Sequence, residues 1–351
     1  MTNRFPISRS IWPAVAALAL SASVSHAAEA AAGAEGKAGW VNATANVGGE
    51  SWGYAGVCKI AAVPDGRRVI AGVSEAGLWA SDDGGATWSR LNQKGAAKIT
   101  HRTYNIVFDP KDPKVMWVSG SYGPGIFKSV DGGESFAQLG TLNHVDGIAI
   151  DFTDPRRATM VAGLHEQTQS LQKSVDGGAT WQKIGDKLPA DSNFPSDPIL
   201  LSAKVLITNT SGWAQKKTWG VLRSEDGGET WQKVSAAGPG GPPLVASDGT
   251  IYWSMLWKSG LLKSGDGGKT WKELKTPTTS SPIELPGTRL AALGGDQVYL
   301  SADGGETWQP LGPKLPQKGN GVVYSTGRFF VWRSSEKKVP DAIFRWDEDR
   351  S

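Results

Sequence analysis

Short apolar runs of strand length recur along most of the chain, separated by turns rich in glycine and aspartate. Runs such as 104–108 and 147–150 are nearly continuous in apolar character, as strands buried on both faces are. A second run follows, as at 115–119, and then a third that leads into a tight turn. The pattern predicts an all-β protein made of repeated groups of four short strands.

One of these turns is repeated almost unchanged as the octet Ser-x-Asp-Gly-Gly-x-Thr-Trp. Its six copies occupy residues 81–88, 129–136, 174–181, 224–231, 264–271 and 301–308. Each copy lies between two strand-like runs, so we expect it to form the turn of a β-hairpin. The aspartate can accept hydrogen bonds from backbone N–H groups beyond it, and the two glycines can take positive φ. The copies begin 37 to 50 residues apart, which fits four short strands per repeat.

This repeated octet resembles the Asp-box, or BNR repeat, of sialidase-like and xyloglucanase-like β-propellers. The resemblance implies a β-propeller in which each box joins the third and fourth strands of a blade, away from the ligand face. It covers residues 39–351, which we expect to form a single β-propeller domain. The family includes glycoside hydrolases, sorting-receptor ectodomains and photosystem assembly factors, so its fold does not fix a function.

Two incomplete repeats stand at the ends of this domain. Residues 39–44 resemble the strand that follows a box, and residues 342–347 resemble the strand that precedes one. We expect these two strands to pair and complete the last blade, because a closed ring leaves no exposed sheet edge. The count is then seven blades, at roughly 52–92, 103–139, 145–184, 195–234, 241–274, 280–311, and 320–347 with 39–44. A six-bladed ring with the last segment as an appendage is the competing arrangement.

Residues 1–27 show the order of features expected of an export signal. Two arginines precede an apolar core at 11–22, and a small-residue cleavage pattern ends at Ala27. We therefore expect a signal peptide that is cleaved near Ala27, a flexible leader at 28–38, and a periplasmic or secreted mature protein.

Charge and composition narrow the expected partners. The chain has 37 Lys and Arg against 34 Asp and Glu, and removal of the two N-terminal arginines would leave 35 against 34. A nearly neutral protein has no long-range attraction to nucleic acid or anionic lipid, so we expect neither as a partner.

No later stretch approaches the roughly 20 apolar residues of a membrane span. The lone Cys58 cannot form an internal disulfide. No phosphate loop or dinucleotide fingerprint occurs, so we expect no cofactor. We also expect the protein to be a monomer.

Titratable residues gather in the loops that the resemblance assigns to the ligand face. All three histidines that follow the export segment lie in loops of blades one to three. The set comprises Glu75, His101, Arg102, Tyr104, Tyr122, His144, Asp146, His165 and Glu166. Converging titratable groups in a concave face are typical of a functional site.

Hydrolysis of a glycosidic bond in a polysaccharide or glycan is the leading hypothesis. This reaction needs two carboxyl groups that flank the scissile bond, and the set above contains Glu75, Asp146 and Glu166. Residues 72–78 resemble the xyloglucanase-family segment that carries an Asp as catalytic base, and the matching position is Glu75. This chain has Glu in place of Asp and lacks a following glycine. Glu166 or Asp146 would then be the acid.

Two other functions use the same face. In polysaccharide β-elimination, a His or Tyr removes a proton beside a uronate carboxylate that an arginine neutralises. His101, His144, His165, Tyr104 and Arg102 offer such a set. In a non-catalytic propeller, the same loops would bind a protein or a glycan. Tyr122, Trp213 and Trp257 would suit either purpose, since aromatic rings stack on sugars and anchor protein interfaces.

Two further chemistries find less support in the sequence. A metal bound by the three histidines is a further option, but their separations of 43 and 21 residues follow no ligand-spacing motif. Sialidase chemistry is disfavoured, because the resemblance calls for an Arg-Ile-Pro-like motif before the first box. Between residues 28 and 81 the only arginines are Arg67 and Arg68.

Overall fold

The computed structural model describes residues 39–44, 47, 56–64, 66, 68–214, 216, 218–334 and 342–348. The expected export segment, its cleavage position and the leader lie outside these residues. Within them the chain forms seven four-stranded antiparallel sheets and one short 3-10 turn, Gly185–Lys187. No helix in this part of the chain is long and apolar enough to cross a membrane.

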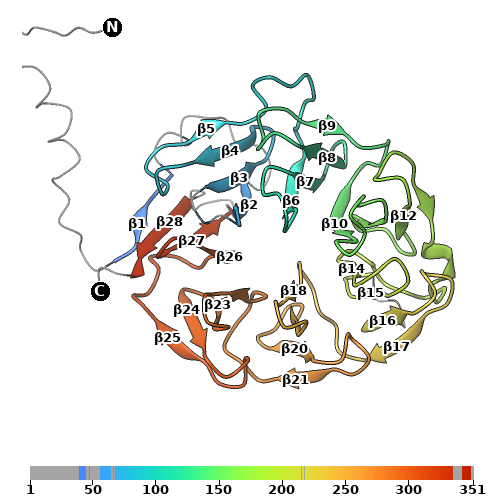
Figure 1. Ribbon diagram of the computed structural model, residues 1–351. Coiled ribbons are helices and arrows are strands. Elements are labelled where there is room, and N and C mark those ends of the chain that lie inside the picture. The colour runs from blue at the N-terminus through green and yellow to red at the C-terminus, as the bar shows by residue number, and fades with distance from the viewer. Residues whose placement is uncertain are drawn as a thin grey trace, which may run out of the picture. The chain divides into compact units, whose positions relative to one another are not determined.

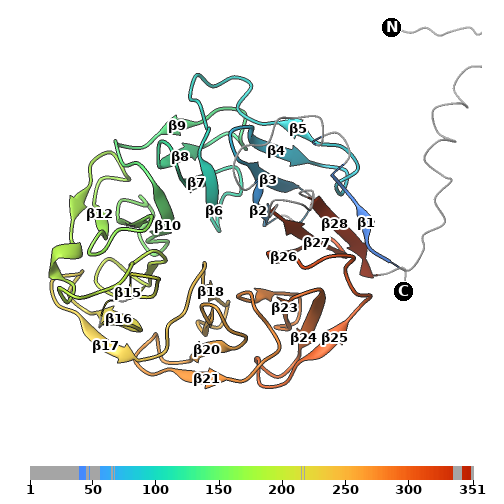
Figure 2. The same cartoon turned by 180° about the vertical axis from the view of Figure 1, so that it is seen from behind.

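The seven sheets stand around a central axis as the blades of a propeller (Figures 1 and 2). The first strand of each blade faces the axis, and the fourth lies at the outer edge. The predicted seven-bladed β-propeller is therefore confirmed, and the six-bladed alternative is wrong. The blade limits expected from the sequence agree with the sheets to within a few residues.

The strands of each blade are ordered from the axis outward. Blades one to three contain β2 (Val57–Ala62), β3 (Val69–Val73), β4 (Gly77–Ser81), β5 (Ser89–Arg90); β6 (Arg102–Phe108), β7 (Met116–Ser121), β8 (Ile126–Ser129), β9 (Ala137–Gln138); and β10 (Val145–Ile150), β11 (Met160–Leu164), β12 (Gln172–Ser174), β13 (Gln182–Lys183). Blades four to seven contain β14 (Ile199–Leu200), β15 (Leu206–Asn209), β16 (Val221–Ser224), β17 (Gln232–Ser235); β18 (Leu244–Val245), β19 (Ile251–Ser254), β20 (Leu261–Ser264), β21 (Lys272–Leu274); β22 (Ile283–Glu284), β23 (Leu290–Gly294), β24 (Gln297–Ser301), β25 (Gln309–Leu311); and β26 (Gly321–Ser325), β27 (Arg328–Arg333), β28 (Ala342–Asp347) with β1 (Val41–Asn42).

The N-terminal strand closes the ring as expected. Strand β1 pairs antiparallel with β28, with Val41 opposite Arg345. Beyond the strand, the Ala43 N–H donates to the carbonyl of Ile343 at 2.8 Å, and the Trp88 indole of blade one donates to the Ala43 carbonyl at 2.8 Å. The first and last parts of the domain are thus tied into one blade and to its neighbour.

Each of the six octets forms the predicted turn between the third and fourth strands of its blade. In the copy at 174–181, the hydroxyl of Ser174 donates to Asp176 at 2.8 Å and accepts the N–H of Gly178 at 2.9 Å. The other Asp176 oxygen accepts the Thr180 hydroxyl at 2.6 Å. The Trp181 indole donates back to the Gly178 carbonyl at 2.9 Å, which satisfies the polar atom of a partly buried ring.

The box aspartates are held in their ionised form by this network. Hydrogen bonds from hydroxyl and backbone N–H groups lower the pKa of Asp131, Asp176, Asp266 and Asp303 to about 2. The pKa values of Asp83 and Asp226 are lowered as well.

Apolar side chains from the two faces of each sheet pack against the neighbouring blades. The described residues form seven hydrophobic clusters, and each one lies between a different pair of adjacent blades. The cluster that joins blades seven and one contains Ala43, Trp88 and Phe330, so the residue that follows β1 contributes to it directly. Between blades two and three, a buried Arg157 guanidinium adds a paired hydrogen bond to Asp109, at 2.7 and 3.0 Å.

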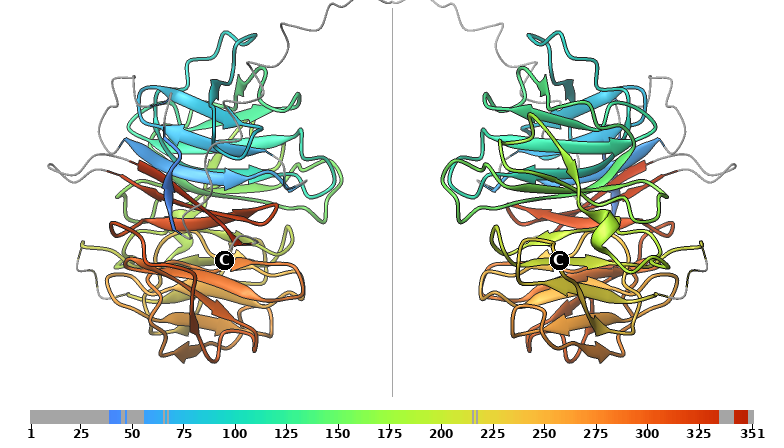
Figure 3. Two further views of the ribbon diagram at one scale, coloured as in Figure 1. Left: turned by 90° about the vertical axis from the view of Figure 1, so that its left-hand side faces the viewer. Right: turned by 90° about the vertical axis from the view of Figure 1, so that its right-hand side faces the viewer.

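In side view the strands run across the thickness of the ring, so that the loops gather on two opposite faces (Figure 3). Because neighbouring strands are antiparallel, the box turns and the turns between first and second strands share one face. The turns between second and third strands and the links between blades share the other. The candidate residues chosen from the sequence lie in these latter loops or, for Arg102, Tyr104 and Asp146, in the first strands β6 and β10 close to them.

Removal of the closing strand is expected to destabilise the whole ring. Deleting residues 39–44 leaves β28 as an open edge and exposes part of the cluster around Trp88 and Phe330. We expect the midpoint of thermal unfolding to fall by about 5 to 10 °C, a loss of several kcal/mol in a domain of this size. Calorimetry would measure it. The control is Val41→Ser, which changes an exposed side chain but keeps the backbone pairing; an unchanged midpoint for the deletion would contradict the role of β1.

The box aspartates are expected to make stability depend on acid pH. A carboxyl group whose pKa is lower in the folded than in the unfolded chain stabilises the fold above pH about 4, and this stabilisation is lost as the pH falls towards about 2. We therefore expect Asp176→Asn to unfold at a lower temperature than the wild type at pH 7, with a difference that shrinks at pH 2 to 3. Asp186→Asn, at an exposed acid outside the boxes, is the matched control. A difference that does not vary with pH would show that the charge of Asp176 is unimportant.

Candidate functional site

The first strands of blades one to three are irregular where they approach the ligand face. A β-bulge interrupts the pairing of β2 between Val57 and Lys59, of β6 between Thr103 and Asn105, and of β10 between Val145 and Ile148. The described first strands of the other blades pair without such a shift. Bulges turn side chains out of the regular alternation and are common beside active sites. Two of the three bulges fall at Tyr104 and Asp146, which are residues selected from the sequence.

A chain of three hydrogen-bonded side chains runs from Asp146 to the surface. The His165 Nδ1 atom lies 2.9 and 3.0 Å from the two Asp146 oxygens, and its Nε2 atom lies 3.1 Å from the Tyr122 hydroxyl. Because a carboxylate can only accept, the imidazole donates through Nδ1, and in its neutral form it accepts the phenolic proton at Nε2. Asp146 is buried and Tyr122 is 51% exposed, so the chain leads from the interior to solvent.

His144 fixes the position of Tyr122. Its Nδ1 atom accepts the backbone N–H of Tyr122 at 3.1 Å, and the two rings meet edge to face with centroids 5.9 Å apart. The backbone of Tyr122 has a φ of 60°, a left-handed conformation that a bulky residue adopts only where its surroundings enforce it. The tyrosine is therefore held in a defined orientation even though half of its surface is exposed.

Glu75 and Arg102 share a pocket with Tyr122. The three side chains line a cavity of about 400 Å³ together with Ser74 and Thr100. Glu75 stands in the turn of blade one with a φ of 63°, in the loop that corresponds to that of Tyr122 in blade two. Arg102 is half-buried, and its positive charge favours the ionised form of Asp146. It therefore lowers the pKa of Asp146, whereas burial raises it.

Burial and hydrogen bonding shift the pKa values of the Asp146–His165 pair. Burial raises the pKa of Asp146, and the hydrogen bond from His165 counteracts part of this rise. The hydrogen bond to Asp146 raises the pKa of His165 above its ordinary value, against the effect of burial. The imidazole is thus a stronger proton acceptor than a free histidine.

Exposed aromatic side chains continue the face beyond this pocket. The Trp213 indole donates to Glu166 at 3.2 Å and meets Phe194 edge to face at 5.4 Å. Trp257, which is 70% exposed, lies in the corresponding loop of blade five, with its ring centre 6.0 Å from that of Trp219. Together with Tyr122, the two tryptophans place exposed rings on blades two, four and five.

Tyr104 belongs to a separate hydrogen-bonded group. Its hydroxyl donates to Asp197 at 2.8 Å, and the other Asp197 oxygen accepts the Ser196 hydroxyl at 3.0 Å. Burial raises the pKa of Asp197 to about 6. The link that carries Asp197 approaches β10 and β11 so closely that a side chain at Gly147 or Gly163 would collide with its backbone.

His101 is not part of the surface site. Its ring is buried beside Phe127, with centroids 5.6 Å apart, and neither ring nitrogen has a hydrogen-bond partner in the described structure. Burial lowers its pKa to about 4, so it is neutral at physiological pH. The side chain packs against Gly120 of β7 and Phe127 of β8.

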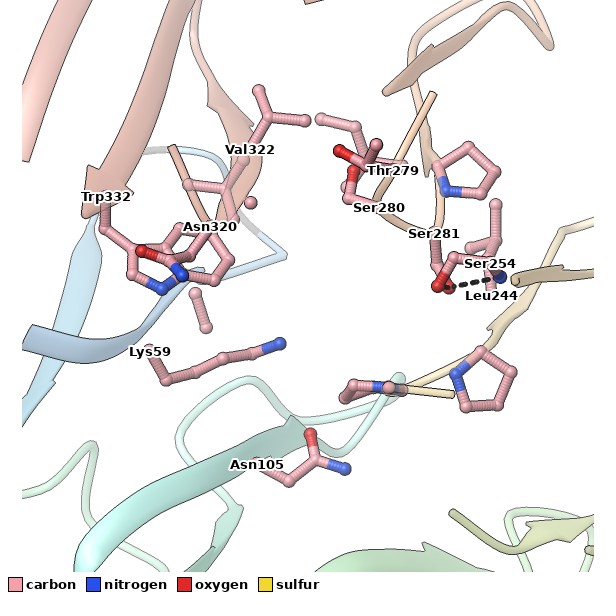
Figure 4. Close-up of a pocket in the computed structure, with 18 of the residues that line it drawn as sticks. Lys59, Asn105, Leu244, Ser254, Thr279, Ser280, Ser281, Asn320, Val322 and Trp332 are labelled. Atoms are coloured by element: carbon pink, nitrogen blue, oxygen red, sulfur yellow. Dashed lines mark hydrogen bonds between the residues drawn. The ribbon is translucent and has the colours of Figure 1, made fainter. Parts of the chain in front are cut away.

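Two residues of this region were not selected from the sequence. Asp197 lies in the link that joins blade three to blade four, just before β14. Lys59 stands in the apolar run 56–63 and lines a larger cavity on the propeller axis (Figure 4). The signal for Lys59 was present, because a lysine inside an apolar inner strand is unusual. Neither cavity contains a candidate metal site: no group of three His, Cys, Asp or Glu that could hold an ion occurs among the described residues.

Comparisons with known proteins agree with the fold. The family model described as Photosynthesis system II assembly factor YCF48 matches residues 138–287, and that of the BNR/Asp-box repeat matches residues 299–310. A protein named xyloglucanase from Paenibacillus sp is 25% identical over 181 residues, which are 48% of this chain and 17% of that protein. The chain thus spans about one sixth of the length of this relative.

Solved structures from two groups share the architecture. A GH74 enzyme from Niastella koreensis aligns over 87% of this chain and 53% of its own, with a TM-score of 0.57 and 16% identity. YCF48 from Cyanidioschyzon merolae aligns over 88% of this chain and 99% of its own, with a TM-score of 0.55 and 14% identity. YCF48 bound to D1 peptide aligns over 88% of this chain and 96% of its own, with a TM-score of 0.55 and 16% identity.

These likenesses are too distant to transfer an activity, but the octets, the repeat match and the seven sheets are mutually consistent. The chain is a seven-bladed β-propeller that carries BNR/Asp-box repeats.

Proposed function

We propose that the protein is an exported carbohydrate-active propeller that cleaves an acidic polysaccharide by β-elimination at the pocket of Tyr122. The observation that carries this proposal is the hydrogen-bonded series Asp146, His165 and Tyr122, which opens at its outer end into a cavity beside Arg102. Such a series supplies a general base at a surface tyrosine, and the arginine supplies the positive charge that a uronate needs.

Each side chain has a role in the proposed reaction. The Tyr122 oxygen takes the proton at C5 of a uronate while its own phenolic proton passes to His165 Nε2. Asp146 stabilises the imidazolium that results. Arg102 neutralises the carboxylate, which favours the enolate formed at C5. The C4–O bond then breaks, a C4=C5 double bond forms, and Tyr122 returns a proton to the leaving oxygen as it recovers its own from His165.

Hydrolysis by Glu75 is the second candidate. It draws support from the place of Glu75 in the same pocket and from the similarity to a protein named xyloglucanase. The geometry favours it less, because a hydrolase needs a second carboxyl group facing the scissile bond. Asp146 is buried behind His165, and Glu166 accepts a hydrogen bond from Trp213.

The aromatic side chains on blades two, four and five would bind the polymer. Tyr122, Trp213 and Trp257 are 51, 59 and 70% exposed, and rings of this kind stack on the apolar faces of sugars. A protein ligand would use the same anchors, so a non-catalytic binding module is the alternative if no glycan is cleaved.

Product release from uronate-containing and neutral polysaccharides tests the two reactions. We expect the wild type to release unsaturated products from a uronate polymer, and Tyr122→Phe to lower that rate by about 10² to 10⁴, the usual contribution of a general base. Tyr299→Phe, outside the pocket in blade six, is the control. Saturated products from a neutral glycan, lost in Glu75→Gln, would instead establish hydrolysis. No product from any glycan would leave the binding module as the function.

The pH dependence of the elimination tests the role of His165. The imidazole must be neutral to accept a proton, so activity should rise with pH through its pKa, which the Asp146 hydrogen bond raises above 6.5. We expect Asp146→Asn to move this acid limb to lower pH, because the charge that raises the pKa is lost, and to lower the maximal rate. An acid limb at the same pH in both proteins would exclude His165 as the proton acceptor.

A further inference from the structure

A second cavity, distinct from the pocket of Tyr122, lies at the axis of the propeller. Its volume is about 620 Å³, and its walls come from blades one, two, five, six and seven. This volume lies in the range of pockets that bind small molecules. Figure 4 shows the Lys59 side chain reaching into the open space, with Asn105 and Asn320 on either side of it in this view.

Lys59 is the one charged side chain among the described residues that line this cavity. In the described structure no hydrogen bond or ion pair engages its ammonium group, which lies 5.5 Å from the centre of the Trp332 ring. Burial lowers the pKa of Lys59 to about 8, and the more distant charge of Asp197 opposes this change. A half-buried ammonium group without a direct counter-ion is costly, so the fold holds it there at the expense of stability.

The neutral polar groups of the wall fall into two kinds. Ser254 and Ser281 bind one another, at 3.1 Å, and are further held by backbone groups. Asn320 uses its oxygen to accept the N–H of Ser334 at 2.8 Å, which leaves its amide N–H groups toward the cavity side as donors. Asn105 makes no side-chain hydrogen bond within the described structure. Lys59, Asn105 and the amide N–H groups of Asn320 are therefore polar groups of the wall that make no hydrogen bond within the described structure.

We propose that this cavity binds a small hydroxylated monocarboxylate, such as a single acidic sugar, with its carboxylate on Lys59 and its hydroxyl groups on Asn105 and Asn320. One ammonium group matches one negative charge, and charge-assisted hydrogen bonds are the strong ones in a partly desolvated site. Amide groups can both donate to and accept from sugar hydroxyls. The apolar lining, which includes Leu244, Val322 and Trp332, suits the carbon skeleton of the ligand.

This inference goes beyond the proposed cleavage and does not depend on it. The cavity residues differ from those of the Tyr122 pocket: Lys59, Asn105 and Asn320 line the one, and Glu75, Arg102 and Tyr122 line the other. The site would bind its ligand whether the propeller is a lyase, a hydrolase or a binding module. Tyr122→Phe should therefore leave binding in the cavity intact.

Calorimetric titration with D-glucuronate tests the site, with D-glucose as the neutral probe. We expect the wild type to bind glucuronate and not glucose. Lys59→Met should weaken this binding by about ten- to hundredfold, the range for a lost hydrogen bond to a charged group. Asn105→Ala should weaken it less, by about three- to tenfold. Lys128→Met is the matched control, since Lys128 also lies over a tryptophan ring, at 5.0 Å from the centroid of Trp117, but does not line the cavity.

Thermal unfolding separates loss of binding from loss of folding. Lys59→Met removes a charge that burial disfavours, so we expect its unfolding midpoint to be equal to or higher than that of the wild type. A folded Lys59→Met protein that binds glucuronate as tightly as the wild type overturns the proposal. The proposal is also overturned if the wild type binds neither glucuronate nor gluconate at millimolar concentration. It is overturned as well if binding is lost in Arg102→Ala but persists in Lys59→Met.

Discussion

Each blade has two apolar faces, and both need a neighbour to cover them. A four-stranded sheet with buried faces cannot be stable alone, and a row of such sheets would end in two uncovered faces. The ring removes both ends at once, because every interface between adjacent blades then holds one of the seven hydrophobic clusters. The pairing of β1 with β28 is what closes this ring, since the chain uses its first strand to complete its last blade.

The box turns make the scaffold uniform on one face. In every copy the serine, aspartate and threonine or serine of the octet form the same internal hydrogen bonds, so each outer hairpin is defined by its own residues. The tryptophan adds a large apolar surface at the edge of four blades with its indole bonded within the turn. A face that is fixed by local bonds leaves the opposite loops free to differ in sequence and length without a change of architecture.

Several unusual features of the molecule lie on that opposite face and along the axis. Bulges interrupt the inner strands of blades one, two and three, and left-handed backbone occurs at Glu75, Tyr122 and Glu166 in their turns. Buried acids with raised pKa values, Asp146 and Asp197, follow in the same sector. Strain and desolvated charge of this kind lower stability, and they persist where the surrounding fold is rigid enough to enforce them. The closed ring provides that rigidity.

The sequence determined the architecture because its signals are local and repeated. Alternating short apolar runs, six octets and two half-repeats at the ends specified the blades, the turns and the closing strand, each from neighbouring residues. Together with the family resemblance, the sequence also placed the titratable loops of blades one to three on one face. It could not show which of their residues form a site. His101 and His165 look alike in the sequence, whereas one is buried beside Phe127 and the other joins Asp146 to Tyr122. Only the tertiary structure decided this, as well as the roles of Asp197 and Lys59, because bulges and contacts between blades depend on packing between segments far apart in the chain.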